Sequence, residues 1–476
     1  MWWLYSLLGL LVLLVIILVI RTLLHHASLI DQPLEDLDVD DEKIIKHFIE
    51  KIQFKTISYD DSSLIDQQAF HDFKAHLRSA YPKINEVATY QKIGTGVLFH
   101  IKGKSSDKPI VLMSHFDVVP VSKNWTVDPF GGSTDDTYVY GRGTLDTKLT
   151  INAVMESVEY MLSKQKVLNQ DVYISFGGDE EIGGKAQRAI VDYFKTHHIR
   201  PYLVLDEGGA IVSHMFPGVK EKVAAIGIAE KGFLNLEFKA ESKGGHASMP
   251  PKETPVTLLA SAVKKLNESK QFKMHMTEPV KAMFDHITPY SSNFFIRMIF
   301  SNMWLFNPII KLIAKLSGGQ LNAMFKTTLA FTVSEGSKAY NVLPNEAKIG
   351  VNIRLRPDES SDVIMARIKK IIANDDITVT PLLVSEPSPL SFMDEGYMML
   401  EKAVTDTWQH TIVSPYLMVA TTDSRYYHDI CDRVYKFSPM DVSKDDLSRM
   451  HADDERMSKE NVINSVKFYI RLLNQC

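Results

Sequence analysis

Histidines and carboxylates follow several apolar runs of the sequence, at the point where each run ends. His115 and Asp117 come directly after the apolar run 110–113. Two residues apart on a strand, they point to the same face. A carboxylate beside a histidine is the usual partner that fixes the tautomer of a metal-binding imidazole. An isolated His-x-Asp pair is more often structural, so this pair indicates a metal site only together with its neighbours.

A second acidic segment follows the next apolar run along the chain. Asp179, Glu180 and Glu181 come after the run 172–176. Three adjacent carboxylates repel one another unless positive charge neutralises them. Either the segment is a solvated acidic loop, or one carboxylate binds a metal while its neighbour stays free as a base.

Three further positions extend this pattern. Asp146 follows a glycine-rich turn and precedes a helical pattern, where an isolated Asp also serves well as a helix N-cap. Asp206 and Glu207 follow the apolar run 203–205, and His451 lies among acidic residues near the end of the chain. Carboxylate oxygens combined with two imidazoles suit a pair of divalent ions, zinc first among them.

The elements that must position these side chains alternate between strand and helix. The three short apolar runs are typical of buried strands, and residues 151–162 carry apolar side chains on one face of a helix. Strand–helix–strand alternation predicts an α/β fold with a mainly parallel sheet. Functional sites of such sheets lie at the carboxyl ends of the strands, which is where the acids and histidines occur.

From about residue 222 the pattern changes. Long, partly alternating strands are expected over 226–240 and 328–356, followed by helices at 254–266 and 361–372. This predicts an inserted α+β domain. The expected organisation is a transmembrane anchor 1–20, a linker 21–42, a first catalytic part 43–221, the insertion 222–385 and a second catalytic part 386–476.

The composition excludes several classes of protein. The chain has 476 residues, of which 45% are hydrophobic and 23% charged, as in a globular protein. Its formal net charge of −5 leaves no basic footprint for nucleic acid. Cys431 and Cys476 are the only cysteines, which excludes a disulfide scaffold.

The first twenty residues carry no charge and are rich in Leu, Val and Ile. At about 1.5 Å per residue, a helix of this length spans the roughly 30 Å hydrocarbon core of a bilayer. No basic segment precedes it and no small-x-small cleavage site follows directly, so a single membrane anchor is favoured over a cleaved signal peptide. Arg21 alone leaves the side of the catalytic domain undetermined.

Residues 271–326 are the most apolar stretch after the anchor. Phe295 and Trp304 stand in its most aromatic part. Ordinary core packing explains such a stretch. The alternative is a hydrophobic surface that lies against the membrane or shelters an acyl chain.

Taken together, several motifs resemble peptidase family M20. The similarity extends from about residue 45 to residue 475, in the order in which the family carries its motifs. It is nearest to the carboxypeptidase S and N-acyl-amino-acid hydrolase branch, and it implies a dizinc-peptidase catalytic domain with an inserted lid and dimerisation domain. The motifs are Met113-Ser-His-Phe-Asp-Val-Val-Pro120, Asp128-Pro-Phe130, Gly141-Arg-Gly-Thr-Leu-Asp146, Asp179-Glu-Glu181, Asp206-Glu-Gly-Gly209, Gly244-Gly-His-Ala-Ser248, Asn341-Val-Leu-Pro344 and His451.

The resemblance implies two Zn²⁺ ions per subunit, with other divalent ions as alternatives. In the family pattern Asp146 bridges both ions. His115 and Asp206 then complete one ion, and Glu181 and His451 complete the other.

The resemblance also assigns roles outside the ligand set. Glu180 is expected to be the general base, and Asp117 to orient the first histidine ligand. His246 matches the residue that stabilises the oxyanion, Arg354 the arginine that holds the free carboxylate of the substrate, and Asn341 a residue that hydrogen-bonds nearby.

Some of these assignments have alternatives. Glu207 competes with Asp206, because relatives use either acid there, but the Leu-Asp-Glu-Gly pattern favours Asp206. Arg354 also suits a surface strand, and Asn341 a turn before Pro344.

The activity implied is that of a zinc-dependent hydrolase that cleaves an amide bond next to a free carboxylate, as an exopeptidase of short peptides. An N-acyl-amino-acid amidohydrolase is the alternative. A non-catalytic anchored binding protein is a remote one, because Glu180 and all ligands are retained. A homodimer through the lid is also implied, with His246 acting in cis or in trans. In the family the peptide bond after the bridging Asp is cis, so we expect this form at Asp146–Thr147.

Overall fold

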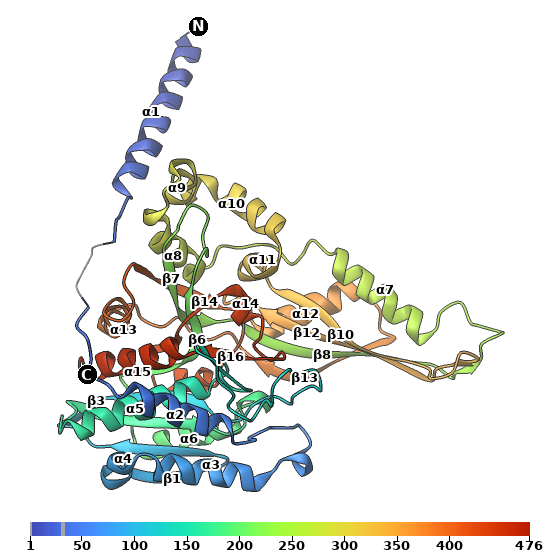
Figure 1. The fold of residues 1–476 in the computed structure, drawn as a ribbon. Coiled ribbons are helices and arrows are strands. Elements are labelled where there is room, and N and C mark those ends of the chain that lie inside the picture. Colours follow the sequence, from blue (N-terminus) through green and yellow to red (C-terminus); the bar gives the residue numbers. More distant parts are fainter. Residues whose placement is uncertain (1, 30–33) are drawn as a thin grey trace.

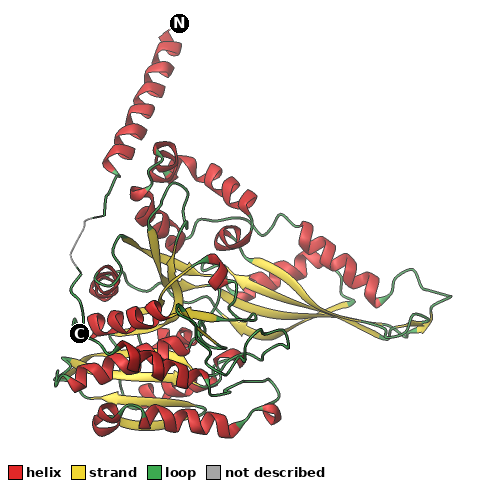
Figure 2. Ribbon diagram, viewed as in Figure 1, coloured by secondary structure: helices red, strands yellow, loops and turns green. Residues whose placement is uncertain are grey.

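A computed structural model describes residues 2–29 and 34–476, and it has a mixed α/β fold built on two larger sheets (Figures 1 and 2). Eight strands form the larger sheet. Their order is β1 (Thr89–Ile93), β2 (Gly96–Ile101), β5 (Gln170–Gly177), β3 (Ser105–His115), β6 (Leu203–Val212), β15 (Val434–Val442), β7 (Lys222–Glu230) and β14 (Thr411–Met418).

The centre of this sheet is parallel. β3 pairs in parallel with β5 and with β6, and β6 pairs in parallel with β15. β1, β2 and β5 are joined by antiparallel pairing, as are β6 and β7. In the β3–β5 register His115 lies opposite Gly177, so the acidic segment after β5 emerges beside the histidine.

Alternation along β3 divides the core between the two faces of the sheet. Ile110 and Leu112 join a core that includes residues of α5 (Lys148–Ser163) and α15 (Lys459–Leu473). Val111 and Met113 point the other way, into a core with residues of α6 (Lys185–Thr196). Since a strand turns successive side chains to opposite faces, an uninterrupted apolar run is what a strand covered on both sides requires.

The second sheet is antiparallel and has four strands. Their order is β10 (Thr328–Glu335), β12 (Glu346–Leu355), β8 (Gly232–Glu241) and β13 (Ile377–Ser385). α7 (Pro255–Glu268) and α12 (Ser361–Ile372), the two helices predicted from the sequence, pack against it. This sheet extends away from the first, and the segments that join its strands lie at its far end (Figure 1).

The strand expected over 226–240 is two strands that belong to different sheets. β7 lies in the eight-stranded sheet and β8 in the second one, and they meet at Lys231. Its buried ammonium donates to the backbone oxygens of Ala323 and Lys326. The expected single insertion over 222–385 therefore contributes to both sheets, beginning with β7.

Residues 278–325 form a group of helices beside β14, within the stretch predicted as strongly apolar. They are α8 (Glu278–Ile287), the short η3 (Thr288–Tyr290), α9 (Phe294–Ser301), α10 (Met303–Ser317) and α11 (Gly319–Phe325). They share a hydrophobic core with β14 and with the segment after β6.

The apolar N-terminal segment is a single helix, α1 (Trp2–Leu24), which projects from the rest of the molecule next to α9 (Figure 1). Met1 and residues 30–33 of the expected linker lie outside the described residues, and residues 21–24 continue the helix. The remaining elements are η1 (Ser62–Leu64), α2 (Asp41–Ile52), α3 (Gln67–Ser79), α4 (Pro82–Val87), β4 (Tyr138–Tyr140), η2 (Glu180–Ile182), β9 (Gly245–His246), β11 (Val342–Leu343), α13 (Glu395–Thr405), η4 (Asp423–Asp429), α14 (Lys444–Leu447) and β16 (Arg456–Ser458).

Candidate metal centre

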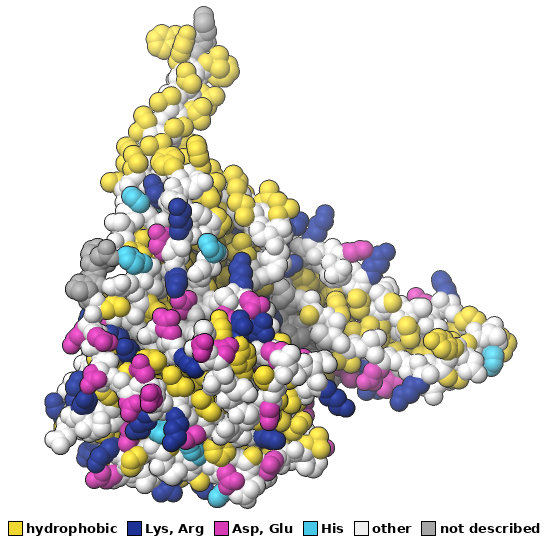
Figure 3. Space-filling view, in the orientation of Figure 1, with side chains coloured by type: hydrophobic (Ala, Val, Ile, Leu, Met, Phe, Trp, Pro, Cys, Tyr) yellow, Lys and Arg dark blue, Asp and Glu magenta, His cyan; other side chains and the backbone are white. Residues whose placement is uncertain are grey.

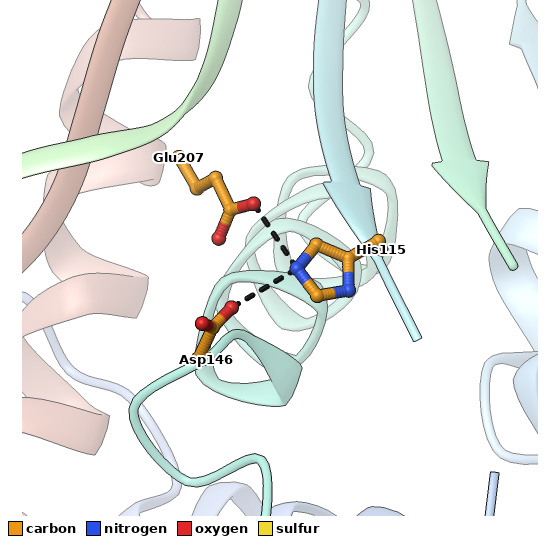
Figure 4. A group of neighbouring side chains, drawn as sticks. All are labelled: His115, Asp146 and Glu207. Atoms are coloured by element: carbon orange, nitrogen blue, oxygen red, sulfur yellow. Dashed lines mark hydrogen bonds and ion pairs between the residues drawn. The ribbon is translucent and has the colours of Figure 1, made fainter. Parts of the chain in front are cut away.

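Three side chains meet at the carboxyl ends of the central strands (Figure 4). His115 is the last residue of β3, Asp146 stands two residues before α5, and Glu207 lies within β6. His115 Nε2 is 3.0 Å from Asp146 Oδ1 and 3.1 Å from Glu207 Oε1. One imidazole nitrogen therefore faces two carboxylates from two different elements.

A second group uses the other oxygen of the same aspartate. Asp146 Oδ2 is 2.8 Å from His451 Nε2, which is 3.4 Å from Glu181 Oε1. Within each group, the atoms able to bind a metal lie within 4.8 Å of one another. Asp146 is shared by both groups, which is the position of a bridging ligand.

The charge of these residues suits a pair of divalent cations. Burial raises the pKa of the Glu207 carboxyl to about 7, and the negative charge of Asp146 adds to the effect. Burial also raises the pKa of Glu181, whose buried Oε1 atom faces His451 Nε2. Buried carboxylates this close together need positive charge between them. With two imidazoles available as nitrogen ligands, the set fits zinc and other divalent metals.

Asp117 orients the imidazole of His115 through contacts with its Nδ1 atom. The Nδ1 atom of His115 is 2.9 Å from the backbone oxygen of Asp117 and 3.3 Å from its Oδ1 atom. The same carboxylate accepts hydrogen bonds from Ser58 Oγ and from the backbone N–H groups of Glu180 and Glu181. The two contacts of His115 Nδ1 with acceptor oxygens favour a proton on this nitrogen, which makes Nε2 the nitrogen that can bind a metal.

Asp206 does not face the metal centre. One of its oxygens accepts the N–H of Glu207 at 2.9 Å and the other accepts the N–H of Ser424 at 2.9 Å. Because neighbouring residues of a strand point to opposite faces, only one of the two acids reaches His115, and it is Glu207. Glu207, and not the expected Asp206, therefore belongs to the group of side chains that could hold this ion.

Glu180 stands next to a ligand without joining either group. It begins the short helix η2 after β5, and its backbone N–H is held by Asp117. Loss of solvent around Glu180 raises its pKa well above the ordinary value, with further contributions from Asp423 and Glu207. A carboxyl of raised pKa beside a metal centre suits a group that takes up and releases a proton.

Glu455 supports the loop that presents Asp146, a role that the sequence did not reveal. It is fully buried. Its carboxylate accepts a hydrogen bond from Arg142 Nη1 at 2.6 Å and from the backbone N–H groups of Gly143, Leu145 and Asp146. Its main partners are backbone groups, so spacing and residue type carried no signal for it.

The start of α5 also answers one question left open by the sequence. Its N-cap is Thr147, so Asp146 does not cap the helix. The expected cis peptide bond at Asp146–Thr147 is present.

The three predicted substrate residues lie outside the eight-stranded sheet, Arg354 in the second sheet and the other two at or beside the two-stranded sheet of β9 and β11. His246 is exposed on β9, which pairs with β11 directly after Asn341, and Ala247 N donates to Asn341 O at 3.1 Å. Figure 1 shows these joining segments at the far end of the sheet, away from the strand ends that carry the metal centre. Arg354 lies on β12, opposite Phe233 near the start of β8. The structure thus brings His246 and Asn341 together but not next to the metal ligands of the same chain.

Comparison with known sequences gives consistent matches. The sequence profile of peptidase family M20/M25/M40 matches residues 111–475. Probable carboxypeptidase S-like 2 of Dictyostelium discoideum is 34% identical, over 91% of this chain and 85% of that protein. N-fatty-acyl-amino acid synthase/hydrolase PM20D1 of Xenopus tropicalis is 33% identical, over 89% and 83%, and the Homo sapiens protein of that name is 30% identical, over 89% and 85%.

Solved structures share the fold. Human carnosine dipeptidase 1 superposes with a TM-score of 0.66 at 14% identity, covering 93% of this chain and 100% of that one. The M20 family metallo-carboxypeptidase Sso-CP2 from Sulfolobus solfataricus gives 0.66 at 18% identity, covering 90% and 98%. YXEP of Bacillus subtilis, described as a dinuclear metal binding peptidase, gives 0.55 at 12% identity, covering 91% and 97%.

The choice between Glu207 and Asp206 yields a first prediction. Glu207→Gln should weaken zinc binding by more than the roughly 10–100-fold that loss of an outer partner costs. Asp206→Asn, its matched control, should keep most of the metal, because Asp206 serves two backbone N–H groups. Zinc affinity is measured by competition with a chelator. Loss of metal from the Asp206 variant alone would restore Asp206 as the ligand.

A second prediction concerns Glu455. Glu455→Gln should lower the free energy of unfolding by about 3–5 kcal/mol, because it leaves the buried Arg142 guanidinium without its counter-charge. Asp429→Asn is the control, since its ion pair with Lys195 is largely exposed and contributes about 0–1 kcal/mol. Denaturant unfolding in detergent measures both. An equal decrease in the free energy of unfolding in the two variants would contradict a structural role for Glu455.

Proposed function

The chain belongs to peptidase family M20/M25/M40, and we propose that it is a dizinc hydrolase that cleaves an amide bond next to a free carboxylate. The family and its relatives make it a peptidase or amidohydrolase of a metal-dependent kind. One observation carries the finer proposal: the two oxygens of Asp146 face two different imidazoles, each with a second carboxylate beside it.

The proposed ligand set follows this geometry. His115, Asp146 and Glu207 would hold one ion, and Asp146, Glu181 and His451 would hold the other. Bound zinc ions would polarise the scissile carbonyl and lower the pKa of the attacking water molecule. Asp117 keeps His115 in the required tautomer and fixes the segment that carries Glu181.

Glu180 is the proposed general base. It takes a proton from the attacking water and returns this proton to the nitrogen that leaves when the amide bond breaks. Burial raises the pKa of Glu180 above its ordinary value, which supports this role because it favours uptake of the proton by the carboxylate. The position next to Glu181 supports this role as well.

Arg354 is the proposed anchor of the free carboxylate of the substrate. Its Nε atom donates to Asn352 Oδ1 at 3.2 Å, which holds the planar guanidinium and leaves both terminal nitrogens for a bidentate contact. The side chain also stacks over Phe233, with the guanidinium carbon 5.7 Å from the ring centre.

His246 and Asn341 are proposed to stabilise the transition state, although neither lies at the metal centre of its own chain. His246 Nδ1 lies 2.7 Å from Ser248 Oγ and accepts the backbone N–H of Ser248, so Nε2 is the nitrogen that can carry a proton for an oxyanion. Both residues lie on joining segments at the end of the second sheet (Figure 1), so they reach a metal centre when that sheet closes or when it meets a partner subunit in a homodimer.

An N-acyl-amino-acid substrate is the second candidate, and one observation favours it over a peptide. A mainly apolar cavity of about 240 Å³ lies among α8 to α11 and is lined by Phe284 and Tyr416. The same apolar core contains Met418, whose Cε atom lies 3.0 Å from the place of a Cβ on Gly208, next to Glu207. The apolar core that lines the cavity thus extends to β6 at Gly208. Several relatives are named N-fatty-acyl-amino acid synthase/hydrolase.

We further propose that α1 is a membrane anchor that is kept in the mature protein. It has 23 residues, enough to cross a bilayer, although a signal sequence has the same properties. Contacts between its C-terminal end and the folded chain support the anchor. Leu18 and Thr22 are buried there, and Asn302 Nδ2 lies 3.4 Å from both Leu18 O and Thr22 Oγ1.

The function is tested with Glu180→Gln. This variant should lower kcat by about 10²–10⁴-fold, the usual value of general acid–base catalysis, while it keeps its zinc. Glu181→Gln is the matched control, because loss of this proposed ligand should remove metal as well as activity. Activity and bound zinc are measured on the same zinc-loaded samples, with dipeptides, N-acetyl amino acids and long-chain N-acyl amino acids as substrates.

The substrate panel separates the two candidates. Faster hydrolysis of dipeptides supports the exopeptidase, and faster hydrolysis of long-chain N-acyl amino acids supports the amidohydrolase. A decrease in kcat of less than tenfold in the Glu180 variant would show that Glu180 is not the general base. No turnover of any substrate by the wild type would favour an anchored binding protein.

A further inference from the structure

We infer that the outward side of α9 and α10 is a membrane-docking face, which lies in the headgroup region of a lipid bilayer. The inference goes beyond the proposed hydrolase and rests on the proposed anchor α1. The docking face consists of Phe295 on α9 and of Trp304, Leu305, Ile309, Leu312, Ile313 and Leu316 on α10, all of them exposed.

α10 is apolar on both of its sides. Met303, Ile310 and Ala314 are buried against the rest of the protein. The side that faces away from them is also apolar, with Trp304 60% exposed and Leu316 77% exposed. A helix on the surface of a water-soluble domain normally turns a polar face outward. An exposed apolar stripe of this length indicates that another apolar phase covers it.

The position of α1 identifies this phase as lipid. Asn302, which joins α9 to α10, hydrogen-bonds Met298 O at 2.8 Å and lies 3.4 Å from Thr22 Oγ1 in the last turns of α1. His25 Nδ1, just beyond α1, lies 2.8 Å from Ser301 Oγ. The docking face therefore begins at the end of the apolar span, where a transmembrane helix leaves the hydrocarbon. Figure 3 shows hydrophobic side chains gathered where α1 meets the adjoining helices.

The charges around the docking face agree with a bilayer. No Asp or Glu occurs between Asp285 and Glu335, whereas Lys311 and Lys315 lie on α10 itself. Amines beside an apolar stripe match the phosphates of lipid headgroups, and Trp304 is of the residue type that favours this depth. A second copy of the chain would also cover apolar side chains, but it would not explain why the face starts at the end of α1.

Docking gives the hydrolase a fixed orientation. The anchor attaches the domain to the bilayer at one point, and the docking face adds a second attachment that holds it against the surface. α9 and α10 also wall the apolar cavity, through Ile296, Ile299 and Ile313. The cavity then lies next to lipid, which is where an amphiphilic substrate would be dissolved.

The test places nitroxide labels on the full chain in lipid nanodiscs with one copy per disc. Leu312→Cys reports the docking face, Leu11→Cys reports α1, and Lys92→Cys on β1 is the control, at the opposite end of the molecule from α1 (Figure 1). The native Cys431 and Cys476 are buried. Spin relaxation measures access of oxygen, which concentrates in lipid, and of a nickel chelate, which stays in water.

Docking predicts that labels at 312 and 11 lose access to the nickel chelate while the label at 92 keeps it. A label at 312 that is as open to nickel as the label at 92, with 11 protected, would overturn docking and leave the anchor and the hydrolase intact. Nickel access at both 312 and 11 would overturn anchor and docking together. Protection of 312 only in discs with two copies would assign the face to a second copy. Leu316→Cys repeats the measurement where Leu312→Cys does not fold.

Discussion

Burial of several carboxylates around Asp146 is the constraint on which the centre of this structure depends. Asp146, Glu181 and Glu207 lie close together, and burial raises the pKa of the latter two. Such a group is unstable without positive charge, and a pair of histidines supplies only part of it. The surrounding elements hold these carboxylates close together, in positions where bound cations would neutralise them.

Two buried acids outside the ligand set do most of this holding. Asp117 binds the imidazole of His115 and the backbone of the segment after β5, so that one carboxylate orders ligands from two elements. Glu455 does the same for the loop before α5. The parallel register of β3 and β5 brings these supports to one edge of the sheet. Fold and site are therefore connected through hydrogen bonds to backbone groups.

Sequence patterns predicted much of this arrangement, but not its details. Acids and histidines at the ends of apolar runs indicated the site, because parallel strands end at the same edge. The choice of Glu207 over Asp206 depends on which face of β6 each side chain occupies, whereas the Leu-Asp-Glu-Gly pattern of the sequence favoured Asp206. The split of 226–240 into β7 and β8 was missed because both strands are apolar and adjacent in sequence. The docking face could not be predicted from the sequence alone, because an apolar helix has the same kind of sequence whether its outer side packs against protein or against lipid.

Asp146 is proposed to bridge two ions, and X-ray absorption at the zinc edge on the full chain tests this bridge most directly. Two zinc ions per chain with metal–metal scattering at about 3.5–4 Å, lost in Asp146→Asn, are the predicted result. A single ion with no metal–metal scattering in the wild type, or a pair that persists without the Asp146 carboxylate, would contradict the account.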